Sequence, residues 1–280
     1  MPHSSLSTEQ VQHYRQNGYL FPLRAMSGEM AAGYLRKVEA FESEYGGQSG
    51  EVLRQKSHVV LTWVNELIRL EPVLDAVESL IGPDILCWST SFFIKNANDP
   101  HFVAWHQDAP YWGLDSNDIV SAWIALTPSN EMNGCLKVLG GSHKQVVQHE
   151  ARFTKNNMLL QGQEIAVEVD ETQATKLVLE PGQFSFHHPM IIHGSAPNSS
   201  SGRRIGFAVR YLKTSARQLR FDTDTATLVR GSDRFGHFIP EPTPASDMHP
   251  AAVGFLDDLL SKRYGGHFRY RKEKDAASLS

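Results

Sequence analysis

The spacing of apolar residues predicts helices in the first third of the chain. Ser7 and Gln10 have the spacing of a capping box, and Gly18 suits the end of the helix that would follow. Further helices are predicted from Ser27 to Gly46-Gly47, over 61–71 and over 73–81, with Pro72 as the break between the last two.

From residue 85 the pattern changes to short runs of β-branched and aromatic residues, which are typical of strands. Strands are predicted over 85–95, 119–126, 135–139, 176–179, 184–188 and 204–212. Turn-forming residues such as Pro181-Gly182 separate them. The polar stretch 213–250 is predicted to be a long loop, followed by a short helix from Asp247 to Lys262.

Many short strands separated by turns favour a sandwich or barrel. We find neither an internal repeat nor a linker, and therefore expect one domain over 1–280 of the α+β class. Its core would be a double-stranded β-helix of the jelly-roll, cupin-like kind, at about 85–215. N-terminal helices, at about 1–84, would pack on that core, and a loop and a helix would complete the C-terminal part.

Composition narrows the class of protein further. Hydrophobic residues make up 41% of the 280 residues and charged residues 21%, as in an ordinary soluble domain. The formal net charge of −4 offers no basic field for nucleic acid, and no apolar run is long enough to span a membrane. The N-terminus is polar and has no apolar run of the kind found in a signal peptide, so none is expected. Cys87 and Cys135 stand in apolar, strand-like settings. We expect two buried thiols and a cytoplasmic location.

Candidate chemistry is concentrated in two segments. In AWHQDAPYW, His106 and Asp108 are two residues apart, so on a strand both would point to one face. The second segment contributes His193, and Arg204 begins the strand that follows. Two histidines and one carboxylate are the ligand set of non-haem iron(II) oxygenases. An arginine fork suits the free carboxylate of a 2-oxo acid that chelates the metal.

The segments HQDAPYWGLDSNDIVSAWIAL, NGCLKVLGGSHK and HGS, together with Arg204, resemble the phytanoyl-CoA dioxygenase family. The resemblance covers roughly residues 8–240 and is densest from 85 to 212. It implies Fe(II), 2-oxoglutarate and O2 as the reactive partners. It implies iron ligation by His106, Asp108 and His193, with Arg204 holding the far carboxylate of 2-oxoglutarate. By position, it implies that Ser195, Trp123 and Lys95 line the 2-oxoglutarate pocket.

The resemblance also bears on the type of reaction. Halogenases related to this family have Ala or Gly in place of the metal-binding carboxylate. Because Asp108 is present here, hydroxylation is favoured over halogenation.

Other polar and aromatic residues are open to two interpretations. Strand alternation places one of His187 and His188 inward, and both are expected to be non-ligands. Arg210 shares a strand face with Arg204 and would meet either an anionic substrate or a local acid. Tyr111 and Trp112 follow the metal motif and are candidates for the substrate rim.

These residues predict a hydroxylase acting on a small polar metabolite, anionic or zwitterionic, with 2-oxoglutarate converted to succinate. An acyl-CoA substrate remains the alternative within the family. Two alternative functions come from other classes of protein. One is a catalytically silent binding protein on the same fold, and the other is a metal-dependent hydrolase or isomerase of cupin type. The oligomeric state cannot be read from the sequence.

Overall fold

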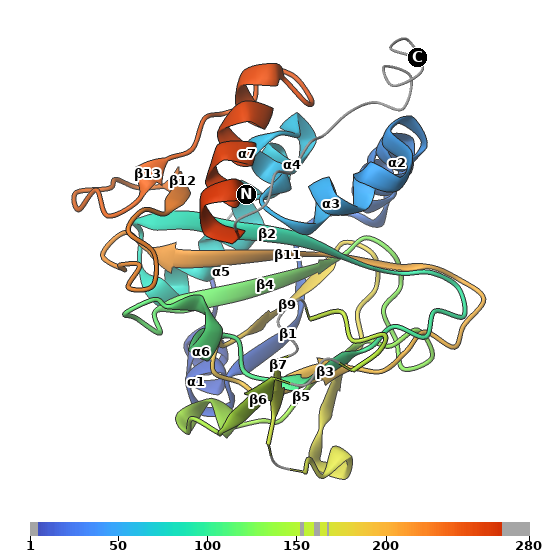
Figure 1. Ribbon diagram of the computed structural model, residues 1–280. Coiled ribbons are helices and arrows are strands. Elements are labelled where there is room, and N and C mark those ends of the chain that lie inside the picture. The colour runs from blue at the N-terminus through green and yellow to red at the C-terminus, as the bar shows by residue number, and fades with distance from the viewer. Residues whose placement is uncertain (1–4, 152–153, 160–162, 167, 265–280) are drawn as a thin grey trace.

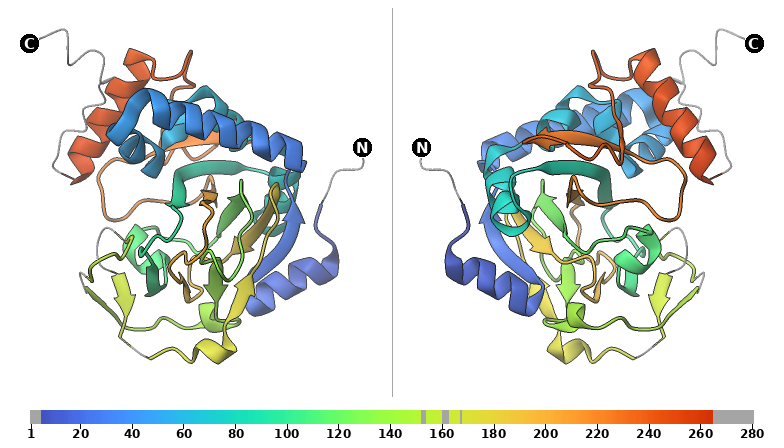
Figure 2. Two further views of the ribbon diagram at one scale, coloured as in Figure 1. Left: turned by 90° about the vertical axis from the view of Figure 1, so that its right-hand side faces the viewer. Right: turned by 90° about the vertical axis from the view of Figure 1, so that its left-hand side faces the viewer.

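Helices cover one face of a large β-sheet, and a smaller sheet lies against its other face (Figures 1 and 2). The computed structural model describes residues 5–151, 154–159, 163–166 and 168–264. The α-helices are α1 (Thr8–Asn17), α2 (Gly28–Tyr45), α3 (Ser49–Arg54), α4 (Thr62–Leu67), α5 (Glu71–Ile81), α6 (Ala109–Trp112) and α7 (Pro250–Tyr264). Short 3-10 helices cover Gly46–Gln48, Ser57–Val59, Ser142–Lys144 and Glu171–Gln173.

The strands belong to two facing sheets and a separate hairpin. The large sheet has the order β1 (Tyr19–Arg24), β9 (Gln183–His187), β4 (Ile119–Ala125), β11 (Arg204–Lys213), β2 (Ile85–Lys95), β12 (Thr225–Arg230) and β13 (Ile239–Pro240). The small sheet has the order β3 (Val103–His106), β10 (His193–Ser195), β5 (Leu136–Val138) and β8 (Thr175–Leu177). The hairpin consists of β6 (His149–Ala151) and β7 (Gln163–Ile165). This arrangement confirms the predicted α+β class with a jelly-roll core.

Local signals explain where the first helices begin and end. Ser7 and Gln10 form the predicted capping box of α1, and Gly18 ends that helix in the left-handed conformation. Ser27 caps α2, which ends at Tyr45, as predicted. The prediction for Pro72 was wrong: it stands in the first turn of α5, where the missing N–H is not needed, so it begins a helix instead of breaking one.

Alternation along β11 separates the core from the pocket. One face of β11 points away from the pocket and packs with the N-terminal helices in the main apolar core; its residues are Ile205, Phe207, Val209 and Tyr211. The opposite face of β11 carries Arg204, Gly206, Ala208 and Arg210 toward the small sheet. One face of this sheet therefore stabilises the fold, and the other is left for chemistry.

The prediction of a long loop over 213–250 was wrong in part. β12 pairs with β2 and, in parallel, with the short β13, and so extends the large sheet. The predicted terminal helix is present as α7, which begins at Pro250. The two cysteines are free and buried, as predicted.

None of the helices in the described ranges has the length and hydrophobicity needed to cross a membrane.

Candidate active site

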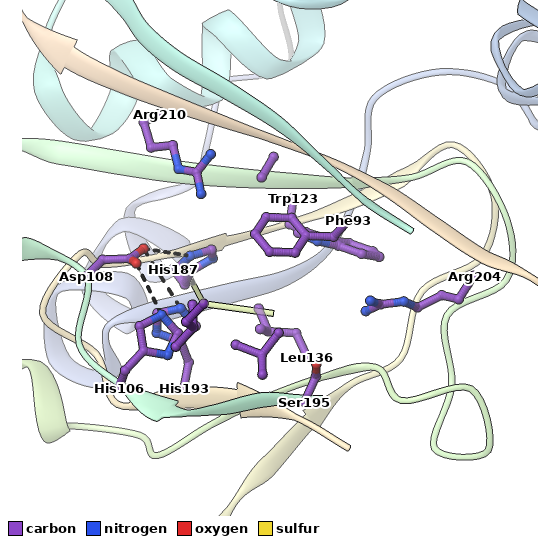
Figure 3. A pocket seen from close by; sticks show the side chains of 13 residues that line it. Phe93, His106, Asp108, Trp123, Leu136, His187, His193, Ser195, Arg204 and Arg210 are labelled. Carbon is purple, nitrogen blue, oxygen red and sulfur yellow. Dashed lines mark ion pairs between the residues drawn. The ribbon is translucent and has the colours of Figure 1, made fainter. Parts of the chain in front are cut away.

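Two histidines and one aspartate meet between the two sheets. His106 Nε2 lies 3.3 Å from Asp108 Oδ1, and His193 Nε2 lies 3.8 Å from Asp108 Oδ2. The two imidazole rings are 4.1 Å apart. One nitrogen from each histidine and one carboxylate oxygen all lie within 4.8 Å of one another, so the three side chains have the geometry to hold a metal ion (Figure 3).

The small sheet brings the two histidines together. His193 begins β10 and is the direct cross-strand partner of His106 at the end of β3. The expectation that Asp108 shares a strand with His106 was wrong, because β3 ends at His106 and Asp108 precedes α6 in a helical conformation. The backbone N–H of Asp108 donates to the Pro189 carbonyl at 2.9 Å, which fixes this turn. The Asp108 carboxylate therefore reaches the histidines from the turn between β3 and α6, and not from a position within the strand.

Backbone carbonyls orient both imidazoles toward the aspartate. His106 Nδ1 lies 2.8 Å from the Ala104 carbonyl, and His193 Nδ1 lies 3.0 Å from the Ile191 carbonyl. These acceptors require Nδ1–H, which leaves each Nε2 with its lone pair directed into the site. Such hydrogen bonds are the usual support of a metal-ligating histidine.

The pKa shifts favour the protonation states that a metal requires. Burial lowers the pKa of His193 to about 4, so its imidazole is neutral at pH 7. Burial alone would raise the pKa of Asp108, but the neighbouring His193 and His106 outweigh it and hold that pKa well below its usual range. Neutral imidazoles and an ionised carboxylate are the forms that bind a divalent ion. The donor set therefore fits iron(II).

Arg204 approaches the same pocket from the start of β11. Its Nη1 donates to the Gly134 carbonyl at 3.0 Å, whereas Nε and Nη2 are buried without a hydrogen-bond partner among the described residues. The guanidinium lies 5.3 Å from the ring of Trp123, which also lines the pocket. Burial lowers the pKa of Arg204 to about 10, so it stays charged at pH 7. An unpaired buried charge of this kind fits an anionic co-substrate.

Ser195 lies at the wall of the pocket, and Lys95 lies behind it and contacts its hydroxyl. Ser195 lines the pocket, and its hydroxyl accepts from Lys95 Nζ at 2.7 Å. Lys95 also donates to the Ala196 carbonyl at 2.5 Å and does not itself belong to the lining of the pocket. Burial and the neighbouring Arg204 lower the pKa of Lys95 to about 6. Lys95 therefore supports Ser195, whose hydrogen is left free to donate into the pocket.

The remaining predicted residues separate into two groups. Arg210 lines the pocket, with Nη1 donating to Ser91 Oγ at 2.8 Å. Tyr111 and Trp112 are absent from the described lining, contrary to the expectation that they form its rim. Tyr111 packs edge-on against His149, and Trp112 packs against Trp88 in a separate apolar cluster.

Sequence reasoning left open which of His187 and His188 faces inward, and it missed the apolar part of the lining. His187 faces the pocket, with Nε2 4.0 Å from Asp108 Oδ2, while His188 points away toward Tyr14 and His143. Phe93 and the aliphatic side chains of Val103, Leu136, Leu159 and Ala208 complete the cavity, whose volume is about 520 Å³ including its open mouth. Phe93 was detectable from the sequence, because it alternates with Lys95 on a predicted strand.

Arg203, which precedes Arg204 in the sequence, faces away from the pocket. It forms a bidentate ion pair with Glu42 of α2, at 2.7 and 3.0 Å. The two consecutive arginines thus have separate environments, because Arg203 lies just before β11 whereas Arg204, the first residue of β11, lines the pocket.

Comparisons with known proteins agree with this geometry. Residues 5–206 match the phytanoyl-CoA dioxygenase family. The bovine peroxisomal phytanoyl-CoA dioxygenase is 29% identical over 71% of this chain, which spans 66% of that relative. A probable alpha-ketoglutarate-dependent hypophosphite dioxygenase of Stutzerimonas stutzeri is 24% identical over 74% of this chain and 79% of its own. The solved structure of the non-heme monooxygenase ThoJ has a TM-score of 0.81 at 33% identity, covering 91% of this chain and 96% of its own.

Fold, triad and relatives together define a non-haem iron oxygenase of the 2-oxoglutarate-dependent class. Within that class, the chain belongs to the phytanoyl-CoA dioxygenase family.

Proposed function

We propose that this protein is an Fe(II)- and 2-oxoglutarate-dependent hydroxylase of a small polar metabolite. The observation that carries the proposal is Arg204, a fully buried guanidinium with two unpaired nitrogens in the pocket that also holds the triad. Leaving such a charge unpaired is costly, so the site is built for a carboxylate that arrives with the co-substrate.

Each residue of the pocket would have a defined task. His106, Asp108 and His193 would hold the iron through three ligands on one face. Arg204 and Ser195 would orient 2-oxoglutarate, and the apolar lining would exclude water. When bound, iron and 2-oxoglutarate supply the activation of dioxygen, with release of succinate and carbon dioxide and transfer of one oxygen atom to a substrate carbon.

Support for a small polar substrate comes from the lining opposite Arg204. Arg210 and His187 place polar nitrogens beside the triad, in the same pocket that must hold the co-substrate. The relative from Stutzerimonas stutzeri is named for a small inorganic oxyanion, hypophosphite. The bovine relative is named for an acyl-CoA, which therefore remains the alternative to test.

The proposal is tested by a substrate screen that measures succinate formed per substrate consumed. Small carboxylates, amines, zwitterions and acyl-CoA esters would be supplied at equal concentration with Fe(II), 2-oxoglutarate and O2. We expect coupled succinate formation with a small polar compound. Turnover of acyl-CoA esters alone would show that the substrate is an acyl-CoA and not a small polar compound. Failure of every compound to raise succinate formation would favour the catalytically silent binding protein.

The assignment of Arg204 makes a separate prediction. Arg204→Ala removes two charge-assisted hydrogen bonds, each worth about 1.5–3 kcal/mol, so the apparent constant for 2-oxoglutarate should rise by roughly tens-fold or more. Iron affinity, measured by equilibrium dialysis under anaerobic conditions, should change little. The matched control is Arg203→Ala, because Arg203 pairs with Glu42 outside the pocket. An unchanged 2-oxoglutarate constant in Arg204→Ala would contradict the assignment.

A further inference from the structure

The turn that carries Asp108 lies beyond the strand that holds the first histidine of the triad. β3 ends at His106, so the cross-strand pairing of that histidine does not extend to the carboxylate two residues later. Figure 3 shows this carboxylate directed at the imidazoles of the other two triad residues. The Pro189 carbonyl accepts from the Asp108 N–H and fixes one side of the turn. The other side depends on the residue between the two ligands.

Gln107, which separates these two ligands, ties the turn to two other parts of the chain. It is fully buried, and its side-chain Nε2 donates to the Met190 carbonyl at 2.6 Å and to the Gln145 carbonyl at 2.8 Å. Its Oε1 accepts from the Val147 N–H at 3.0 Å. The side-chain amide is thus satisfied within the protein, and the buried backbone N–H of Gln107 needs an acceptor of its own.

His149 supplies that acceptor. Its Nδ1 lies 2.9 Å from the Val147 carbonyl, which requires Nδ1–H and leaves the lone pair on Nε2. The Gln107 N–H donates to this Nε2 at 3.0 Å. The ring of Tyr111 packs edge-on against the imidazole, with 5.3 Å between the ring centroids. These contacts fix the tautomer and the orientation of His149.

We propose that His149 is a positioning residue of the metal site, which holds the peptide between His106 and Gln107 and thereby the turn that carries Asp108. His149 does not belong to the group of three that could hold the ion, so it acts through a backbone N–H and not as a ligand. Without its acceptor, that buried N–H would be unsatisfied, and rotation of the peptide to reach another partner would displace the ligands on both sides. This inference rests on the proposed function, because it takes the triad as the iron site.

Two variants separate the acceptor of His149 from its ring. His149→Phe keeps an aromatic ring against Tyr111 but has no acceptor, whereas His149→Gln loses the ring and can place an amide oxygen near the position of Nε2. Co(II) is the probe, because it binds the same kinds of ligand as Fe(II) and its visible spectrum reports their arrangement. Loss of one hydrogen bond predicts about threefold to tenfold weaker Co(II) binding in His149→Phe, with an altered spectrum. His149→Gln should restore most of the affinity and the spectrum.

Tyr111→Leu is the matched control, because it removes the ring contact with His149 and leaves the hydrogen bond from Gln107 in place. It should keep the Co(II) affinity and spectrum of the unchanged protein. Equal impairment in Tyr111→Leu and His149→Phe would refute the proposal, since packing and not the acceptor would then be responsible. An unaltered spectrum in His149→Phe, or no rescue by His149→Gln, would refute it as well. Should His149→Phe not fold, His149→Leu also lacks an acceptor and carries the same test.

Asp108→Ala separates this inference from the proposed function. If Asp108→Ala binds Co(II) like the unchanged protein, the triad is not the metal site, and both proposals fail. If Asp108→Ala loses Co(II) while His149→Phe binds it normally, only the positioning role of His149 fails. A loss in His149→Phe that His149→Gln restores, without succinate formation by the Fe(II) protein, would leave the positioning role standing and refute the hydroxylase.

Discussion

At the scale of single residues, the metal triad is prepared by hydrogen bonds and burial before any ion arrives. The Ala104 and Ile191 carbonyls select the imidazole tautomers that direct Nε2 inward. Burial keeps His193 neutral, whereas Asp108 stays ionised because its histidine neighbours outweigh the effect of burial on its pKa. Preorganisation of this kind lowers the cost of assembling three ligands around a metal.

Asp108→Ala should weaken iron binding by at least about tenfold, because a direct ligand matters no less than the outer hydrogen bonds whose loss typically costs 10–100-fold. Hydroxylation, measured as substrate-coupled succinate formation, should be lost. Anaerobic equilibrium dialysis with Fe(II) measures the first effect. Asp118→Ala is the control, since that aspartate is an exposed partner of Lys213. Full activity and normal iron content in Asp108→Ala would rule out the assigned triad.

The sequence identified site residues where their type and spacing along the chain formed a recognisable motif. His106, Asp108, His193 and Arg204 were selected by residue type and spacing, and the structure brings all four to one pocket. Which of His187 and His188 faces inward depends on pairing with β1 and β4, and that register is a tertiary property. The choice of His187 as the pocket-lining member of the pair was therefore not visible in advance.

At the scale of elements, regular patterns were predictable and irregular ones were not. The predicted strand 85–95 coincides with β2, and β11 begins at Arg204 as predicted, because long alternating runs specify strands clearly. Asp108 was misplaced because a strand that ends at His106 and turns into a four-residue helix has no periodicity to detect. β12 was missed because TATLVR is recognised as a strand only through its pairing with β2.

One element-level prediction concerns the glycine of β11. A Cβ on Gly206 would lie 1.8 Å from Cζ2 of Trp123, whose ring packs against the Arg204 guanidinium. Gly206→Ala should therefore displace Trp123, destabilise the protein by about 1–3 kcal/mol and raise the apparent 2-oxoglutarate constant. Urea unfolding and succinate assays measure the two effects.

The matched glycine is Gly202, where a Cβ would meet no atom within 4 Å. Gly202→Ala should leave both the unfolding free energy and the 2-oxoglutarate constant near the values of the unchanged protein. Equal behaviour of the two alanine variants would show that Trp123 does not need the space at Gly206.

At the scale of the whole molecule, a buried charged network joins segments that are far apart in the sequence. Glu241 accepts from Lys56 Nζ at 2.6 Å and from His58 Nε2 at 2.8 Å, and from the Thr225 and Thr227 hydroxyls of β12 at 2.7 Å each. Sequence patterns contain no trace of this network, since its members become neighbours only after the sheet has formed.

The same network reaches the central strand β2. Lys56 also donates to the Trp88 carbonyl, and His58 Nδ1 lies 3.0 Å from Thr90 Oγ1. The N-terminal helical part, the β core and the segment after β13 thus share one set of buried hydrogen bonds. We propose on this ground that the described residues form one domain, which should unfold in coincident transitions by fluorescence and circular dichroism.

The last prediction removes the acceptor at the centre of this network. Glu241→Gln leaves the Lys56 ammonium buried without its counter-charge, so the free energy of unfolding should fall by about 3–5 kcal/mol at pH 7 in urea titrations. Glu66→Gln is the control, because Glu66 is exposed and 3.9 Å from Lys37, and it should change stability by less than about 0.5 kcal/mol.

The pH dependence provides an independent check on Glu241. Burial alone would raise the pKa of Glu241, but Lys56 and His58 outweigh it and hold that pKa well below its usual range. As the pH falls through about 4.3, Glu241 becomes protonated in the unfolded chain but stays ionised in the folded protein. The stability that Glu241 supplies is therefore fully present above that pH and is lost as the pH falls further. Glu241→Gln should lose less stability between pH 5 and pH 3 than the unchanged protein does. Parallel losses in the two proteins would mean that Glu241 is not held ionised by Lys56 and His58.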